Sequence, residues 1–146
     1  MRNWARVIAA PFLLLLTAGA ASADDVILVK GKIEAAEYLD GLLSSAQKSS
    51  GVFVDGGNYR IKLAISDVLI GKARKSDLYL TLTITGAPKD DAHPEIFLLA
   101  EQQPNGQLQP IDWDFTQNGI CIDRYTAISY DIEKEIDAVE KKYPCK

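Results

Sequence analysis

Two stretches of strict two-residue alternation constrain the fold of this chain more than any other feature. Over residues 78–85 every second residue is leucine or isoleucine, and tyrosine or threonine stands between them. Residues 59–66 follow the same period, with an aromatic or aliphatic residue at every odd position. Successive side chains of a strand point to opposite faces of a sheet, so this period predicts two strands with one buried face each.

An earlier strand is predicted over residues 25–33, which are rich in valine and isoleucine, with Gly31 as a candidate bulge. The following segment is ambiguous between helix and strand over residues 34–48. Its apolar residues fall at helical spacing between positions 34 and 47, which favours a short helix, although Gly41 weakens that pattern.

A three-stranded meander is predicted after the central pair. The Asn-Gly dipeptide at 105–106 separates a strand over 96–103 from one over 108–115. Asn-Gly is a strong hairpin signal because both residues tolerate positive φ. A second Asn-Gly at 118–119 is expected to lead into a third strand at 120–122.

The C-terminal segment predicts an amphipathic helix over residues 127–143. Its apolar residues recur every three or four positions, and they are Ile128, Ile132, Ile136, Val139 and Tyr143. Thr126 or Ser129 is the expected N-cap, and Pro144 is expected to end the helix. The apolar face should pack on the sheet while the charged face stays in water.

These elements predict a mostly β, α+β domain. Five or six strands of this length favour a small closed or partly open barrel with a C-terminal amphipathic helix. Residues 24–146 form a single domain of 123 residues (146 minus 23), which is long enough to bury a core.

Residues 59–82 resemble the central hairpin of exported OB-fold domains of the netrin-like (TIMP-like) type. In this stretch an alternating strand runs into Asp-Val-Leu-Ile-Gly-Lys at 67–72, and a second strand follows. The resemblance implies an OB-like barrel with C-terminal helices and disulfides, in a family of protease inhibitors and other binding modules. The inhibitors begin with a metal-chelating cysteine, whereas this chain has Asp24 and Asp25, so metalloprotease inhibition by that mechanism is not implied.

The first 23 residues predict a cleaved signal peptide. Arg2 and Arg6 precede an apolar stretch at 7–20, and Ala-Ser-Ala at 21–23 is a small-residue cleavage site. The apolar stretch is shorter than the roughly 20 residues of a membrane helix. We therefore expect a periplasmic or secreted protein without a membrane anchor after cleavage.

Cys121 and Cys145 are the only cysteines. An even number of cysteines in an exported chain predicts one disulfide bond. A metal site would need more soft ligands than these two and a distant His93 supply, so no cofactor is expected.

The charge balance narrows the class of partner. Without residues 1–23 the chain holds 14 basic residues (16 minus Arg2 and Arg6) and 20 acidic ones, a net charge of about −6. An acidic surface repels phosphate backbones, so nucleic-acid binding is not expected. A cationic protein or peptide is the partner class that this charge favours, and the protein itself is expected to be a monomer.

Catalytic chemistry has little support in the sequence. His93, the single histidine, stands far from any serine in a nucleophile-elbow context. Asp112 and Asp114 would project to the same face of a strand, and with Asp123 they are the candidates for acid/base or metal-dependent hydrolysis. The aromatic residues in the opposite phase look like core, so the carboxylates are expected on the wet face.

The same segment carries a spacing like that of a calcium-binding loop. Five oxygen-bearing residues occupy positions one, three, five, seven and twelve: Asp112, Asp114, Thr116, Asn118 and Asp123. The sixth position is Gln117 instead of glycine, the twelfth is aspartate instead of glutamate, and no helix pattern flanks the loop. A hairpin turned at 118–119 accounts for these residues without an ion.

Tyr79 is the most interesting candidate for ligand contact. It lies out of phase with the leucines of its strand, next to Thr81 and Thr83, on the wall where small barrels stack ligands. Alternatively, Tyr79 covers the barrel exterior or packs under the C-terminal helix.

The leading hypothesis is an exported, non-catalytic binding domain, inhibitor-like in character, that engages a protein or peptide. A hydrolase that uses the three aspartates and a structural protein of the cell envelope are the alternatives.

Overall fold

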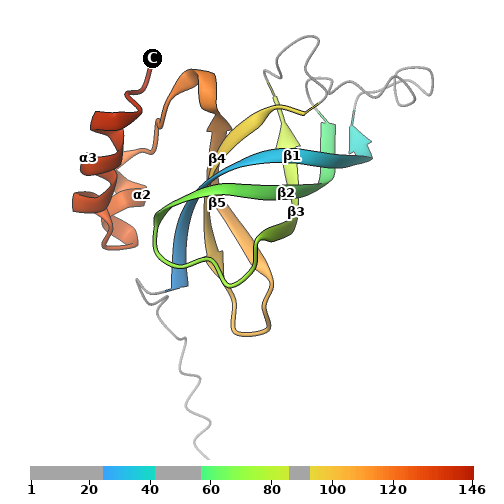
Figure 1. Ribbon diagram of the computed structural model, residues 1–146, viewed down its shortest axis with the longest axis horizontal. Coiled ribbons are helices and arrows are strands. Elements are labelled where there is room, and N and C mark those ends of the chain that lie inside the picture. Colours follow the sequence, from blue (N-terminus) through green and yellow to red (C-terminus); the bar gives the residue numbers. More distant parts are fainter. Residues whose placement is uncertain (1–24, 42–56, 86–92) are drawn as a thin grey trace, which may run out of the picture.

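The computed structural model describes residues 25–41, 57–85 and 93–146. It contains five strands, a 3-10 turn and two helices, in the order β1 (Val26–Gly41), β2 (Gly57–Ile70), β3 (Asp77–Ile84), β4 (Glu95–Gln102), β5 (Leu108–Phe115), η2 (Thr116–Asn118), α2 (Arg124–Ser129) and α3 (Glu133–Lys142). The helices pack at one end of the sheet (Figure 1). The predicted signal peptide lies outside the described residues.

The five strands form one antiparallel sheet in the order β3-β2-β1-β4-β5. The first strand of the chain, β1, is therefore central, with β2 on one side and β4 on the other. Over their described residues the outer strands β3 and β5 approach each other but form no ladder, so the sheet is not closed into a barrel. The predicted class, a mostly β, α+β domain, is confirmed, and the described residues contribute five strands to the sheet.

The helix predicted to begin at residue 34 is wrong over the described part of that segment, because β1 continues to Gly41. Four register shifts interrupt the pairing of β1 with β2, and the last two lie in this segment, between Ile33 and Ala35 and between Tyr38 and Asp40. Each of these last two shifts adds a residue to β1 and breaks its two-residue period. The apolar residues then fall at spacings that imitate a helix. Residues 42–48 of the predicted helix lie outside the described residues.

A register shift lies between Lys30 and Gly31, where the bulge is predicted, but the extra residue is Ser66 of β2, so the bulge belongs to the neighbouring strand. A Cβ atom at Gly31 would lie 2.8 Å from the carbonyl oxygen of Ala64, which real Cβ atoms do not tolerate. The glycine therefore permits a close approach of β1 to β2.

Two apolar cores share the walls made by β1 and β4. Alternate residues of β1 face opposite ways, with Ile27 and Val29 in the first core and Val26 and Leu28 in the second. The first core lies inside the curved sheet and contains the inward residues of β3, namely Leu78, Leu80, Leu82 and Ile84. The second lies between the sheet and the helices, and includes Phe97, Leu99, Ile120, Ala127, Ile132 and Ile136.

The single helix predicted over 127–143 is instead two helices, because the chain reverses at Asp131. Asp131 has φ 55°. Its N–H donates to the carbonyl of Ile128, and the N–H of Ile132 donates to the carbonyl of Ala127, which is a Schellman termination of α2. Ile132 and Ile136 are buried and Val139 and Tyr143 are partly buried, as predicted, whereas Ile128 is 53% exposed, because it lies on the separate helix α2.

The predicted cap residues of the C-terminal helix are also wrong. Asp123 caps α2, and its side chain accepts a hydrogen bond from the backbone N–H of Thr126. Ser129 lies at the other end of this helix, where its hydroxyl donates to the carbonyl of Tyr125.

The hairpin at 105–106 is confirmed, with Gly106 at φ 82° between β4 and β5. The prediction of a third meander strand at 120–122 is wrong, because β5 leads into η2 and then into irregular chain. Ile120 donates its N–H to the carbonyl of Tyr143, and the disulfide between Cys121 and Cys145 closes the same contact. Residues 143–145 therefore lie beside residues 120–121, in the segment where the third strand was predicted.

Candidate functional site at the edge of the sheet

Tyr79, Thr81 and Thr83 point outward from β3, as the alternation predicts. All three are exposed, and the Tyr79 side chain is 66% exposed although the residues on either side of it are not. The Thr83 hydroxyl donates a hydrogen bond to the Asn58 side chain at 2.6 Å, so this hydroxyl already has a partner within the sheet. Tyr79 stands opposite Lys62 of β2.

Two ion pairs of Lys62 lie next to Tyr79 on this outer face. The Lys62 ammonium lies 2.6 Å from Glu34 and 3.6 Å from Asp77. The hydrogen bond from Lys62, together with its charge, lowers the pKa of Glu34, and the hydrogen bond to Glu34 raises the pKa of Lys62. Because both carboxylates are exposed and Lys62 is partly exposed, these pairs add little stability.

A notch of about 130 Å³ opens beside Tyr79. It forms where the β2–β3 loop, the start of β3, the end of β4 and the β4–β5 turn meet. Its lining combines an apolar floor with a polar rim, and consists of Arg74, Lys75, Asp77, Leu78, Tyr79, Gln102, Gly106 and Leu108. At about 30 Å³ per water molecule in the liquid, the notch holds roughly four waters.

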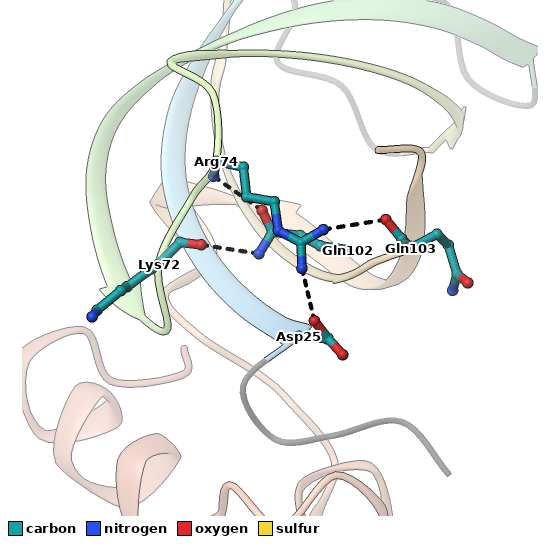
Figure 2. A network of polar contacts seen from close by, with 5 residues as sticks. All are labelled: Asp25, Lys72, Arg74, Gln102 and Gln103. Atoms are coloured by element: carbon teal, nitrogen blue, oxygen red, sulfur yellow. Dashed lines mark hydrogen bonds and ion pairs between the residues drawn. The ribbon is translucent and has the colours of Figure 1, made fainter. Parts of the chain in front are cut away.

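A buried glutamine fixes the loop that forms one wall of the notch (Figure 2). Gln102 is 4% exposed. Its amide nitrogen donates to the Lys72 carbonyl at 2.9 Å, and its amide oxygen accepts from the Arg74 N–H at 3.1 Å. Both polar ends of a buried side chain are therefore satisfied by the β2–β3 loop, which cannot move without breaking them.

The guanidinium of Arg74 ties the same loop to two further segments (Figure 2). It donates to the Asp25 carboxylate at 2.9 Å and to the Gln103 carbonyl at 3.4 Å. The charge of Arg74 is thus compensated. Within the described part of the chain no ion pair involves Lys75, so its ammonium is a free cation at the rim beside Tyr79.

The sequence analysis did not identify Gln102, although its position in the strand indicates a buried polar side chain. It continues the two-residue phase of Ile96, Leu98 and Ala100, all of which face the first core. A polar residue in the inward phase of an apolar strand indicates a buried hydrogen-bonding group.

Asp112 and Asp114 are not on an open wet face, which corrects the prediction. Both are half-buried and line a smaller pocket of about 40 Å³ between the sheet and residues 119–122. Asp112 accepts a hydrogen bond from the Trp113 N–H at 2.8 Å, and Asp114 accepts from the Phe115 N–H and the Asn118 amide, both at 2.7 Å. Burial raises the pKa of Asp112, and the charges of Asp123 and Asp114 add to that effect.

Asp123 is engaged elsewhere, as the cap of α2. Hydrogen bonds from the Thr126 hydroxyl and N–H lower the pKa of this carboxyl. The segment from Asp112 to Asp123 is therefore the end of a strand, a 3-10 turn and a helix cap, and the hairpin predicted there is wrong. In the ranges that the structure describes, no group of three or more metal-ligating side chains converges.

His93 lies beside β1, with its Nδ1 atom 3.0 Å from the carbonyl oxygen of Ile33. No described helix is long and apolar enough to span a bilayer.

No family model, curated protein or solved structure matches the chain. The site must therefore be interpreted from its own geometry.

Proposed function

We propose that this protein is an exported, non-catalytic binding domain that engages a protein or peptide through the notch beside Tyr79. The observation that carries the proposal is an exposed tyrosine ring at the rim of a notch whose wall is fixed by Gln102. An aromatic side chain held at a rigid site gives large contact area at low entropic cost, which is typical of recognition surfaces.

The strand order supports a finer proposal for the fold, a partly open barrel of the OB type, as the netrin-like resemblance implies. In such a barrel β1 pairs on both sides and the outer strands approach each other, as β3 and β5 do here. OB-folds bind ligands over the face of strands 2 and 3 and the adjoining loops. Tyr79 lies on β3 and the notch borders the β4–β5 turn, so both fall within that region.

The disulfide supports the proposed periplasmic or secreted location. Cys121 and Cys145 are bonded in the structure, and such bonds persist in oxidising compartments. The net acidic charge of the chain as a whole supports a cationic partner; at the notch itself Asp77 would attract such a partner and Lys75 would oppose it.

Site-specific photocrosslinking tests the proposed function. Tyr79 is replaced by p-benzoylphenylalanine, and the purified domain is irradiated in envelope extract of the source cells. Tyr125 on α2 is the matched control, because it is also tyrosine and is 84% exposed. We expect an adduct of defined mass from position 79 alone, and we expect excess unlabelled domain to suppress it.

Salt supplies a second measurement on the same adduct. Its yield should fall as ionic strength rises, because a charged partner is screened at high salt. Equal labelling at positions 79 and 125, or no competable adduct at position 79, would overturn the proposal.

A further inference from the structure

The notch beside Tyr79 has an apolar floor sized for one side chain. The floor consists of Leu78, which is buried, and Leu108, which is half-buried and packs against the first core. The volume of about 130 Å³ corresponds to roughly four waters, and a leucine or isoleucine side chain has as many carbon atoms. An aliphatic group that displaces water from such a floor gains the free energy of apolar burial. The notch therefore fits a single aliphatic side chain of a partner.

The two cations at the rim differ in their availability. The Arg74 guanidinium already donates to the Asp25 carboxylate and to the Gln103 carbonyl (Figure 2). Lys75 is exposed, and among the residues that the structure describes no ion pair involves its ammonium. An anion that enters the notch therefore finds its counter-charge at Lys75.

The backbone beside Lys75 is held in place by the preceding residue. The Arg74 N–H donates to the buried Gln102 amide oxygen at 3.1 Å, so the loop presents Lys75 at a fixed position on the rim. On the opposite side the exposed Tyr79 ring carries a hydroxyl group that can also donate to an anion. The site thus offers an apolar floor below a cation and a hydroxyl donor.

The last residue of a polypeptide matches this combination. Its side chain and its α-carboxylate are bonded to the same carbon atom, so a side chain seated on the floor places the carboxylate at the rim. An internal acidic residue carries its anion on a separate side chain, and ordering that second side chain costs entropy. Capture of a C-terminal carboxylate is one of the recurring modes of peptide recognition.

We propose that the notch binds the C-terminus of a partner polypeptide, with an aliphatic last side chain over Leu78 and Leu108 and the α-carboxylate at Lys75. The inference rests on the proposed function, because it takes over the notch and the polypeptide partner and names the part of the partner that is bound. It agrees with a basic partner. Asp77 lies on the same rim, so a basic residue upstream of the terminus has a carboxylate to contact.

Peptide titrations followed by NMR test this proposal on the disulfide-bonded protein. The probe is an N-acetylated peptide, Lys-Thr-Lys-Thr-Gly-Leu, with a free C-terminal carboxylate. The first comparison peptide has the same sequence and ends in a carboxamide. The second keeps the free carboxylate and replaces the last leucine by glycine. The third is the carboxamide with aspartate in place of the internal glycine, so that its anion lies on a side chain.

The free-acid leucine peptide should shift the backbone amide resonances of residues 75–79 and 106–108. The carboxamide should bind roughly threefold more weakly, as expected for the loss of one exposed charge pair. Net charge alone predicts the opposite order, because the carboxamide is the more cationic peptide and the protein is acidic. The glycine peptide should bind about tenfold or more weakly, because it leaves the floor uncovered.

Two variants assign the carboxylate contact. Lys75→Gln should bind the free acid and the carboxamide equally. Lys134→Gln removes an exposed lysine of α3 and is the matched control, so it should keep the preference for the free acid.

Four results would overturn the inference. They are equal or tighter binding of the carboxamide, a preference for the free acid that survives in Lys75→Gln, resonance shifts confined to other segments, and binding of the aspartate peptide as tight as that of the free acid. The last of these would assign the site to an internal acidic residue. If the Tyr79 adduct forms while acid and carboxamide bind alike, the inference fails and the proposed function stands. If the adduct is absent while the acid preference depends on Lys75, the inference stands and the envelope partner of the proposed function does not.

Discussion

Replacement of Gln102 by leucine tests whether the buried amide holds the wall of the notch. Leucine fills a similar volume but makes neither of the hydrogen bonds that reach Lys72 and Arg74. Each such bond contributes about 1 kcal/mol net, and leaving a partner unsatisfied adds to the loss. We expect Gln102→Leu to lower the free energy of unfolding by about 2 kcal/mol. For a domain of this size that corresponds to roughly 6 °C in Tm.

Urea denaturation followed by circular dichroism measures the loss, and Gln117→Leu controls for the change in side-chain chemistry. Gln117 lies exposed in η2, so its substitution should shift stability by no more than about 0.5 kcal/mol. The Gln102→Leu variant should also give less Tyr79 crosslinking, because the loop is released. Stability equal to or above that of the unchanged protein would refute the argument that this amide fastens the loop.

Ile136→Ala should cost about 2–5 kcal/mol in chemical denaturation and Glu140→Ala about 0.5 kcal/mol or less, since Ile136 is buried in the second core; equal midpoints would show that α3 is not a packing element. Thiol titration of denatured, unreduced protein should find no free thiol, and loss of the bond between Cys121 and Cys145 should cost about 3 kcal/mol. Millimolar calcium should leave Tm unchanged, whereas a rise of several degrees would reveal an ion site. Because burial raises the folded pKa of Asp112 above the ordinary 3.8, its stabilising contribution is present at low pH and lost as pH rises through the folded value. Thermal melts of Asp112→Asn should therefore match the unchanged protein near pH 3 and exceed it near pH 7.

The strands that could be predicted are those whose pattern is purely local. β3 alternates without interruption, and its inward leucines are buried as expected. The part of β1 beyond Ile33 could not be predicted, because its strand state depends on hydrogen bonds to β2 and its period is broken by bulges. The missing third strand of the meander has a similar origin, since Ile120 pairs with the distant Tyr143.

The candidate site was partly predictable for the same reason. The exposure of Tyr79 follows from its phase within one strand. The notch could not be foreseen, because its walls come from four segments that meet only through the sheet order. The role of Asp123 was also hidden, since a carboxylate that caps a helix has the same sequence appearance as one that binds a metal ion.

The central position of β1 has a consequence for how the chain folds as it is made. β1 and β2 can pair early, but Val26 must wait for its partner Glu101, which is synthesised only after β2 and β3 are complete. The two residues are 75 positions apart (101 minus 26), so at roughly 5–20 residues per second this delay lasts about 4–15 seconds. During that time the nascent three-stranded sheet exposes the edge of β1 that β4 later covers. The first seven residues of β1 are therefore the last part of this strand to gain a second neighbour, and until then the folding chain has to keep them free of wrong partners.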